Sequence, residues 1–313
     1  MSESHGNGAR LRSFGRYVPE RVVTNVEIAP QLGCDPAWIV QMSGIEERRW
    51  AAPSDTVVSL GVCAARDCLA RAAVEPRDVG LILASSGSAE RRFPGPASAI
   101  GMGLGLPGVP AIDLPMASAG SLFGMALAAD LCARYRNVLV VGSEIMSRAI
   151  GMEPACRDTA ILFGDGAGAC LLSAETGFAR IADCLLASDG AYSESLRLEL
   201  QGPMQMDGQS VIMQASRKVP RAVSELLERN GRKADEIAVY LMHQANRNLI
   251  VRTARSLKTA ESRFFVNVDR YGNTSSASML IAAAEWWAGG AASGPIVFAA
   301  FGAGFHWGAV LAE

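Results

Sequence analysis

Three polar residues, Ser118, His243 and Asn273, follow segments that are expected to be strands, and ligands of open α/β sheets bind beyond such strand ends. A serine hydroxyl at the start of a helix becomes a nucleophile when a base removes its proton. An imidazole supplies that base, and an asparagine amide donates hydrogen bonds to developing negative charge. These residue types therefore permit acyl transfer through a covalent intermediate.

Each of the three residues also has a simpler structural explanation. Ser118 in DLPMASAGSLFG and Asn273 in YGNTSSAS stand where helix N-caps are preferred. His243, which opens HQAN, has no partner nearby in the sequence and is compatible with a surface or capping role. The run Ser275–Ser278 favours close helix packing rather than a site. The local sequence leaves these alternatives open.

Short apolar runs alternate with helical stretches in the first half of the chain. An alanine- and leucine-rich segment, Ser118–Arg134, is typical of a helix. Four runs without a 3.6-residue period indicate buried strands, namely Val79–Ser86, Ala111–Pro115, Asn137–Gly142 and Gly166–Ser173. This order predicts a sheet with helical crossovers.

The second half repeats this order in pattern though not in residue identity, which indicates an internal duplication. Strands are expected at Glu236–Met242, Arg263–Val268, Pro295–Phe301 and Phe305–Leu311, and helices at Asn246–Lys258 and Thr274–Ala288. Residues 174–220 are more polar and richer in glycine, so we expect irregular, substrate-contacting loops there. The sequence thus divides into an N-terminal half, 1–173, and a C-terminal half, 174–313.

The composition argues against several classes of protein. The 313 residues are 50% hydrophobic and 19% charged with a net charge of −2, so neither disorder nor nucleic-acid binding is expected. Glycine and proline interrupt the longest uncharged stretches and the first ten residues are polar, so we expect no membrane helix and no secretory signal. Seven cysteines without a CxxC pair and three dispersed histidines predict reduced thiols, no metal site and a cytoplasmic protein.

Seven motifs, each weak alone, occur in an order and at spacings that together resemble the ketoacyl-ACP synthase III-like condensing enzymes of the thiolase fold. The resemblance extends from about Leu11 to Ala312. The motifs are WIVQMSGIEERR (38–49), DLPMASAG (113–120), LVVGSE (139–144), LFGDGAGA (162–169), HQAN (243–246), YGNTSSAS (271–278) and FGAGFHWG (301–308). It implies a five-layered αβαβα fold of two duplicated halves, and a CoA or carrier-protein thioester as substrate with no cofactor.

The resemblance also implies roles for individual residues. The family uses a Cys–His–Asn triad; His243 and Asn273 match it, whereas Ser118 stands at the position of the cysteine. The oxyanion hole would consist of the backbone N–H groups of Ser118 and Ala303. Phe93 matches a residue that reaches into the acyl pocket of the other subunit, which implies a homodimer.

Substrate-binding positions follow from the same resemblance. Trp38 and Arg157 match residues that contact the coenzyme A nucleotide, and Phe301 and Asn246 match further substrate-binding positions. Two positions depart from the family. Met42 replaces an arginine of the nucleotide clamp, and Asn248 replaces a basic residue that docks the carrier protein.

A serine nucleophile changes the expected chemistry. A thiol is converted to a thiolate by a helix N-terminus and an imidazole, but a hydroxyl needs a base during attack. Its acyl-enzyme is an oxygen ester, which reacts more slowly with carbon nucleophiles. We therefore expect an acyltransferase that uses acyl-Ser118 in fatty-acid-like or polyketide biosynthesis. The alternatives are decarboxylative condensation with malonyl-ACP, a non-catalytic acyl-binding partner subunit, and a serine engineered from cysteine to trap a complex.

Overall fold

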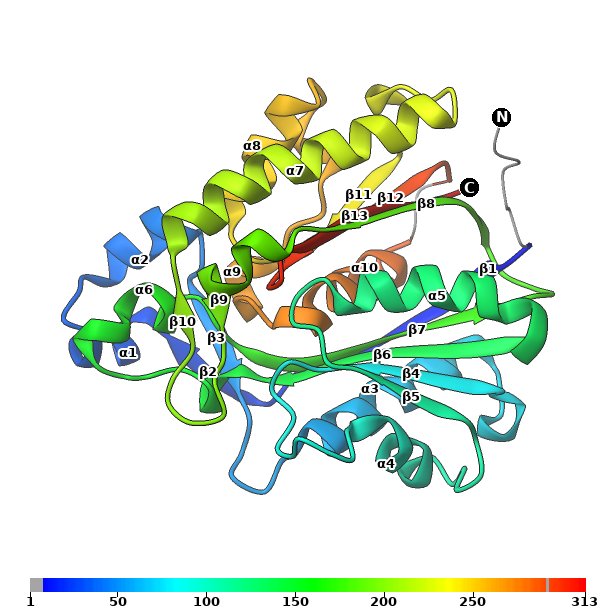
Figure 1. Cartoon of the computed structure of the whole chain (residues 1–313), viewed down its shortest axis with the longest axis horizontal. Coiled ribbons are helices and arrows are strands. Elements are labelled where there is room, and N and C mark those ends of the chain that lie inside the picture. Colours follow the sequence, from blue (N-terminus) through cyan, green and yellow to red (C-terminus); the bar gives the residue numbers. More distant parts are fainter. Residues whose placement is uncertain (1–7, 291–292) are drawn as a thin grey trace.

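A nine-stranded sheet runs through the computed structural model, which describes residues 8–290 and 293–313 (Figure 1). The strand order is β11-β12-β13-β8-β1-β7-β6-β4-β5. One group of strands comes from the first half of the chain: β1 (Arg10–Tyr17), β4 (Leu81–Ser85), β5 (Ala111–Leu114), β6 (Asn137–Ile145) and β7 (Asp165–Ser173). The other comes from the second half: β8 (Ala179–Ser188), β11 (Val239–Met242), β12 (Ile296–Gly302) and β13 (His306–Ala312). A short antiparallel pairing of β1 with β8 joins the two groups.

Helices and the two groups of strands form five layers, as the family resemblance implies (Figure 1). The two inner helices, α5 (Gly120–Tyr135) and α10 (Ser278–Ala288), contact strands of both groups. One outer layer, α3 (Val57–Ala72) and α4 (Pro96–Gly103), covers the first group. The other, α7 (Gly208–Arg229) and α8 (Arg247–Ser256), covers the second. This arrangement confirms the thiolase-like αβαβα fold.

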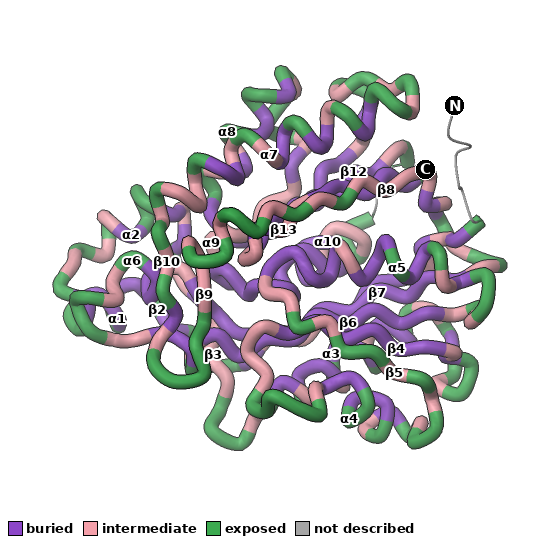
Figure 2. Tube along the Cα trace, in the orientation of Figure 1, coloured by how far each residue is buried: buried purple, intermediate pink, exposed green. Residues whose placement is uncertain are grey.

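The central strands are buried on both faces, which explains their continuous apolar runs (Figure 2). The smaller elements lie at the edges: α1 (Asn25–Leu32), α2 (Pro36–Ser43), α6 (Arg157–Ala160), α9 (Val268–Tyr271), and the pairs β2 (Arg21–Thr24) with β3 (Glu47–Trp50) and β9 (Leu196–Arg197) with β10 (Gln205–Met206). In the described part of the chain, none of the helices has the length and apolar character required to span a bilayer. The domain boundary at residue 173 stays a prediction.

Two predicted elements are wrong. The expected strand Arg263–Val268 makes only one bridge, between Phe264 and Tyr240, before α9 begins at Val268. The Phe264 ring is buried by stacking on the Tyr240 ring, with centroids 4.4 Å apart, rather than by a strand ladder. The predicted irregular region, 174–220, contains β8 and more than half of α7. Both elements are only half-buried, so their exposed faces carry polar residues and their sequences resemble those of loops.

Candidate active site

Ser118 lies in a sharp turn between β5 and α5. Its φ of +62° is left-handed, a conformation that is uncommon for a residue with a side chain and occurs where surrounding structure enforces it. The N-cap of α5 is Ala119, and no side chain caps the helix. The Ser118 hydroxyl forms no hydrogen bond with any described residue, although the residue is only 7% exposed. The capping explanation for this serine is therefore wrong.

The turn between β12 and β13 packs directly against this serine. A Cβ atom on Gly302 would lie 2.3 Å from the Ala117 carbonyl oxygen and 2.8 Å from the Ala119 nitrogen. Only glycine permits this approach, which brings residues of the C-terminal half next to Ser118. Ala303, the next residue, lines a small cavity together with Ser118.

His243 follows the last residue of β11 and is fixed from two sides. Its backbone N–H donates to the Ala299 carbonyl at 2.8 Å, and its Nδ1 bonds with the Ser278 hydroxyl. Nε2 is therefore the ring nitrogen that remains for a substrate. Burial lowers the pKa of His243 to about 4, so the imidazole is neutral at pH 7.

Asn273 lies in the turn between α9 and α10. Its Oδ1 accepts from the Ser275 N–H at 2.9 Å, and its own N–H donates to the Leu162 carbonyl at 2.8 Å. Because Oδ1 faces the backbone, the amide is oriented, and its Nδ2 group makes no hydrogen bond within the described residues. An Asn N–H₂ group held in this way is a donor prepared for a substrate oxygen.

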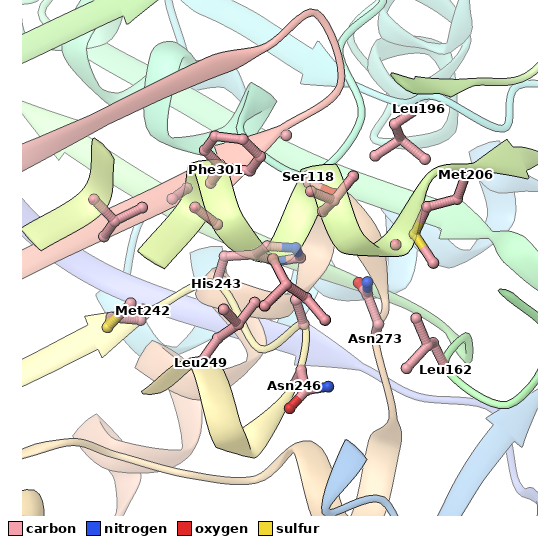
Figure 3. A pocket seen from close by; sticks show the side chains of 18 of the residues that line it. Ser118, Leu162, Leu196, Met206, Met242, His243, Asn246, Leu249, Asn273 and Phe301 are labelled. Atoms are coloured by element: carbon pink, nitrogen blue, oxygen red, sulfur yellow. The ribbon is translucent and has the colours of Figure 1, made fainter. Parts of the chain in front are cut away.

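The side chains of Ser118, His243 and Asn273 line one cavity of about 100 Å³ (Figure 3). The figure shows His243 and Asn273 on neighbouring parts of its wall, with Ser118 close to both. No charged residue lines it, and most of its wall is aliphatic or aromatic. A second cavity of about 40 Å³ shares Ser118, Phe163 and Leu196 with the first and includes Ala303. Ser118 thus lies where two mostly apolar spaces meet, and the wall of the second also includes Arg197.

Residues 273–278, here called the serine segment, connect all three side chains. Ser275 Oγ accepts from the Ser118 backbone N–H at 3.0 Å, and Ser278 holds His243. Asn273 is the first residue of the segment. Ser275 also has a left-handed φ of +47°. The N–H of Ser118 that is predicted to form the oxyanion hole is therefore engaged by a protein hydroxyl.

A buried carboxylate, Glu144, anchors the serine segment. It accepts hydrogen bonds from the backbone N–H and hydroxyl of Ser276, at 3.2 and 2.7 Å. It also accepts from the hydroxyls of Ser86 and Ser88 and from the backbone N–H groups of Gly87 and Ser88. Glu144 lies at the end of β6 and is 0% exposed, so it ties the two halves together directly behind the site.

This hydrogen-bond network was not predicted from the sequence. The serine run was assigned to helix packing alone, which is incomplete because Ser275, Ser276 and Ser278 each hold a neighbour through the hydroxyl. One signal for Glu144 was present in the sequence: a carboxylate closing a strand as apolar as NVLVVG is rarely buried without several donors.

The predicted substrate-binding residues are only partly brought together. Phe301 and Asn246 line the cavity. Trp38 and Arg157 lie outside it but contact one another, with the guanidinium 4.8 Å from the ring centroid. Phe93 is 84% exposed and lines neither cavity, which is compatible with a contact to another subunit but does not test it.

Asn246, which lines the cavity, is hydrogen-bonded to the C-terminal end of α2. Asn246 donates to the Met42 carbonyl at 2.9 Å, and the Asn248 side chain donates to the carbonyls of Gln41 and Met42. The two asparagines therefore fix the C-terminal end of α2. Among the described residues, His, Cys, Asp and Glu side chains form no cluster of three or more that could hold a metal ion.

Comparisons with known proteins identify the family of the chain. Residues 112–190 match the family described as 3-oxoacyl-[acyl-carrier-protein (ACP)] synthase III, and residues 227–313 match its C-terminal region. A beta-ketoacyl-[acyl-carrier-protein] synthase III from Methylococcus capsulatus is 35% identical over 97% of this chain and 98% of its own. The one from Brucella melitensis is 36% identical over 96% and 98%.

Solved structures show the same likeness over the whole length. The 3-oxoacyl-[acyl-carrier-protein] synthase III of Aquifex aeolicus superposes with a TM-score of 0.93 at 32% identity, covering 97% of this chain and 99% of its own. The priming beta-ketosynthase of the R1128 polyketide pathway superposes with a TM-score of 0.89 at 30% identity, covering 97% and 96%.

Proposed function

Because the chain belongs to the 3-oxoacyl-[acyl-carrier-protein] synthase III family, we propose that it takes an acyl group from a CoA or carrier-protein thioester and holds it as an ester on Ser118. The acyl group then passes to an acceptor in fatty-acid-like or polyketide biosynthesis. The observation that carries the proposal is the unbonded hydroxyl of Ser118, which lies in an apolar cavity with His243 and Asn273 in its wall.

The first step needs a proton acceptor and a stabilised oxyanion. Ser118 Oγ attacks the thioester carbonyl while its proton passes to His243 Nε2; the C–S bond then breaks, and the thiol leaves with that proton. The positive end of the α5 dipole and the Ala303 N–H support the negative oxygen. The Ser118 N–H joins them once Ser275 Oγ releases it.

A second candidate, decarboxylative condensation with malonyl-ACP, is favoured by one observation. Ser278 Oγ accepts the Gln244 N–H at 3.0 Å, and its own proton is available to His243 Nδ1, which accepts it in one of the two imidazole tautomers. The imidazole proton then lies on Nε2 and points into the cavity. Beside the Asn273 amide, it forms a pair of donors suited to the enolate oxygen produced by decarboxylation. The acylation of Ser118 and any transfer by base catalysis use the other tautomer, in which Nδ1–H donates to Ser278 Oγ.

Intact-mass spectrometry after incubation with a panel of acyl-CoA and acyl-carrier-protein donors tests the shared first step. A covalent adduct that is absent in Ser118→Ala is expected. No adduct with any donor would contradict the proposal and favour a non-catalytic acyl-binding subunit. The matched control is Ser216→Ala, because Ser216 lies on α7 and lines neither cavity.

Product analysis separates the two second steps. Malonyl-ACP added to the acylated protein gives carbon dioxide and a β-keto product if condensation occurs. An ester, amide or thioester without decarboxylation indicates transfer. Because an oxygen ester reacts more slowly with carbon nucleophiles than a thioester does, Ser118→Cys is expected to gain condensation activity. An unchanged condensation rate would contradict this expectation.

The proposal also covers the oligomeric state, the location and the binding partners of the protein. The protein acts as a cytoplasmic homodimer, with Phe93 of one subunit in the acyl pocket of the other, and needs no cofactor or metal. It binds acyl-CoA or acyl carrier protein, and neither nucleic acid nor membranes. Sedimentation velocity of the wild type and of Phe93→Ser tests the dimer, since losing a buried aromatic anchor weakens an interface by about 2 kcal/mol or more. An unchanged association would exclude that contact.

A further inference from the structure

The main cavity extends past His243 into a pouch beneath α7. We define this pouch by the five residues that line its wall there: Ala215, Val219, Met242, Thr253 and Ala299. Figure 3 shows Met242 on one side of His243, with Asn273, Leu162 and Met206 on the other. The pouch thus leads away from the elements near Leu162.

Every group in this pouch is apolar or already satisfied. All five residues are buried, with exposures of at most 6%. The only hydroxyl, on Thr253, donates to the Leu249 carbonyl at 2.9 Å within α8. A carboxylate or phosphate placed here would meet no cation, so the pouch excludes charged groups. Aliphatic and aromatic groups suit it.

The pouch is separate from the second cavity. That cavity includes Ala303, whose N–H lies where the oxygen of an acyl-Ser118 ester is expected, together with Gly87, Met146 and Met204. We assign the acyl chain of acyl-Ser118 to this second cavity, whose wall is mostly apolar. The pouch remains empty at this stage, and its opening lies beside the imidazole.

We infer that the pouch binds the uncharged, apolar part of the acceptor, an alkyl or aryl group attached to a hydroxyl, amine or thiol. This inference rests on the proposed acyl-Ser118. The acceptor X–H attacks the ester carbonyl, the C–X bond forms, the C–Oγ bond breaks, and the X–H proton reaches Ser118 Oγ through His243 Nε2. The nucleophilic atom must therefore lie at His243, and the rest of the acceptor enters the adjacent pouch.

Calorimetric titration of the full chain with 1-alkanols from butanol to decanol tests the inference without any acyl donor. Affinity is expected to rise about three- to fourfold per methylene, from the transfer free energy of a buried CH₂, until the pouch is full. Absence of binding, or affinity independent of chain length, would overturn the inference. If alkanols bind as expected but Ser118 is never acylated, the proposed function fails and the pouch stands as a binding site.

Two variants place the alkanol in the pouch. Ala299→Leu fills it and is expected to weaken 1-octanol binding at least tenfold. Ala309→Leu is the matched control, because Ala309 pairs with Ala299 across β12 and β13, is equally buried and does not line the cavity. Equal losses in both variants, or none in Ala299→Leu, would overturn the assignment.

A third variant decides the question if the leucine substitutions prevent folding. Met242→Ala enlarges the pouch and is expected to extend the rise in affinity to longer alkanols. If the alkanol length at which affinity stops rising is the same in Met242→Ala as in the wild type, the alkanol binds elsewhere and the inference is overturned. In the acylated protein, Ala299→Leu and Met242→Ala are expected to change the preferred acceptor length, whereas the control Ala309→Leu is expected to leave it unchanged.

Discussion

The wall behind Ser118 and the cavity in front of it are built from opposite kinds of residue. Behind it, Glu144 and the serine segment form a dense hydrogen-bond network, with six groups donating to one carboxylate. In front of it, no charged side chain lines the cavity, and the Ser118 hydroxyl has no partner among the described residues.

This difference separates two tasks. Hydrogen bonds are directional, so the polar wall fixes where His243, Asn273 and Ser118 lie relative to one another. Apolar contacts depend on shape and volume, so the cavity determines which chains enter. Changes behind Ser118 should therefore affect folding and rate, whereas changes in front should affect substrate preference.

The largest effect is expected from removing the carboxylate of Glu144. In Glu144→Ala, buried N–H and O–H groups lose their acceptor, at about 1–3 kcal/mol for each group that water cannot reach. We expect the free energy of unfolding, measured in urea, to fall by about 3–5 kcal/mol, as when a buried charged network is broken. In the control Glu175→Ala, an exposed salt bridge with Arg136 is lost, and a change below about 1 kcal/mol is expected. Similar losses in the two variants would refute the anchoring role.

The next largest effect is a pH dependence of stability that is caused by His243. Burial lowers the pKa of His243 to about 4, whereas an unfolded histidine titrates near 6.5. Between these values the unfolded chain binds a proton that the folded chain does not, so stability is present above pH 6.5 and is lost as the pH falls towards 4. The loss should approach about 3 kcal/mol, from 1.36 kcal/mol per pKa unit.

Urea unfolding at pH 7, 6, 5 and 4 measures this loss against variants. His243→Gln should remove most of the slope between pH 6.5 and 4. Burial also lowers the pKa of His306, which is less buried than His243. His306→Gln should therefore remove a smaller part of the slope. If His306→Gln flattens the profile more than His243→Gln, the assignment to the buried wall is wrong.

The sequence predicted the parts of this molecule that depend on short-range pattern. Apolar runs gave β4, β6, β7, β12 and β13, and their buried positions explain why, since a strand covered on both faces is apolar throughout. Ser118 and His243 follow β5 and β11, as the strand pattern predicted. Asn273 also lines their cavity, but it follows helix α9 and not the strand that was expected before it.

The parts that failed depend on contacts between distant residues. Nothing local shows that Ser275 engages the N–H of Ser118, 157 residues away, or that Glu144 reaches Ser276, 132 residues away. β8 and α7 were missed for another reason: each is half-buried, so its composition resembles that of a polar loop.

A smaller effect is expected where the polar wall meets the substrate. In the wild type, the Ser118 N–H must break its hydrogen bond to Ser275 Oγ, worth about 0.5–1.5 kcal/mol, before it can donate to the oxyanion. Ser275→Ala removes that competing acceptor. We expect Ser118 acylation, followed by quenched-flow mass spectrometry, to rise roughly twofold to tenfold, with a modest loss of stability. Ser276→Ala, which leaves that N–H engaged, should not accelerate acylation. A slower reaction in Ser275→Ala would mean that this hydroxyl positions the nucleophile instead of competing for its N–H.

The smallest effect is expected outside the cavity, at the pair formed by Trp38 and Arg157. A cation–π contact at an exposed site contributes about 0.5–1 kcal/mol, so Trp38→Ala should raise the KM for an acyl-CoA donor by roughly two- to fivefold. The maximal acylation rate should stay unchanged, because neither side chain lines the cavity that holds Ser118. An acyl-pantetheine donor, which lacks the nucleotide, serves as the control and should show no change in KM. If the KM for both donors rises equally, Trp38 and Arg157 stabilise the local structure and do not bind the nucleotide. Residues outside the cavity would then contribute to substrate binding only through the fold.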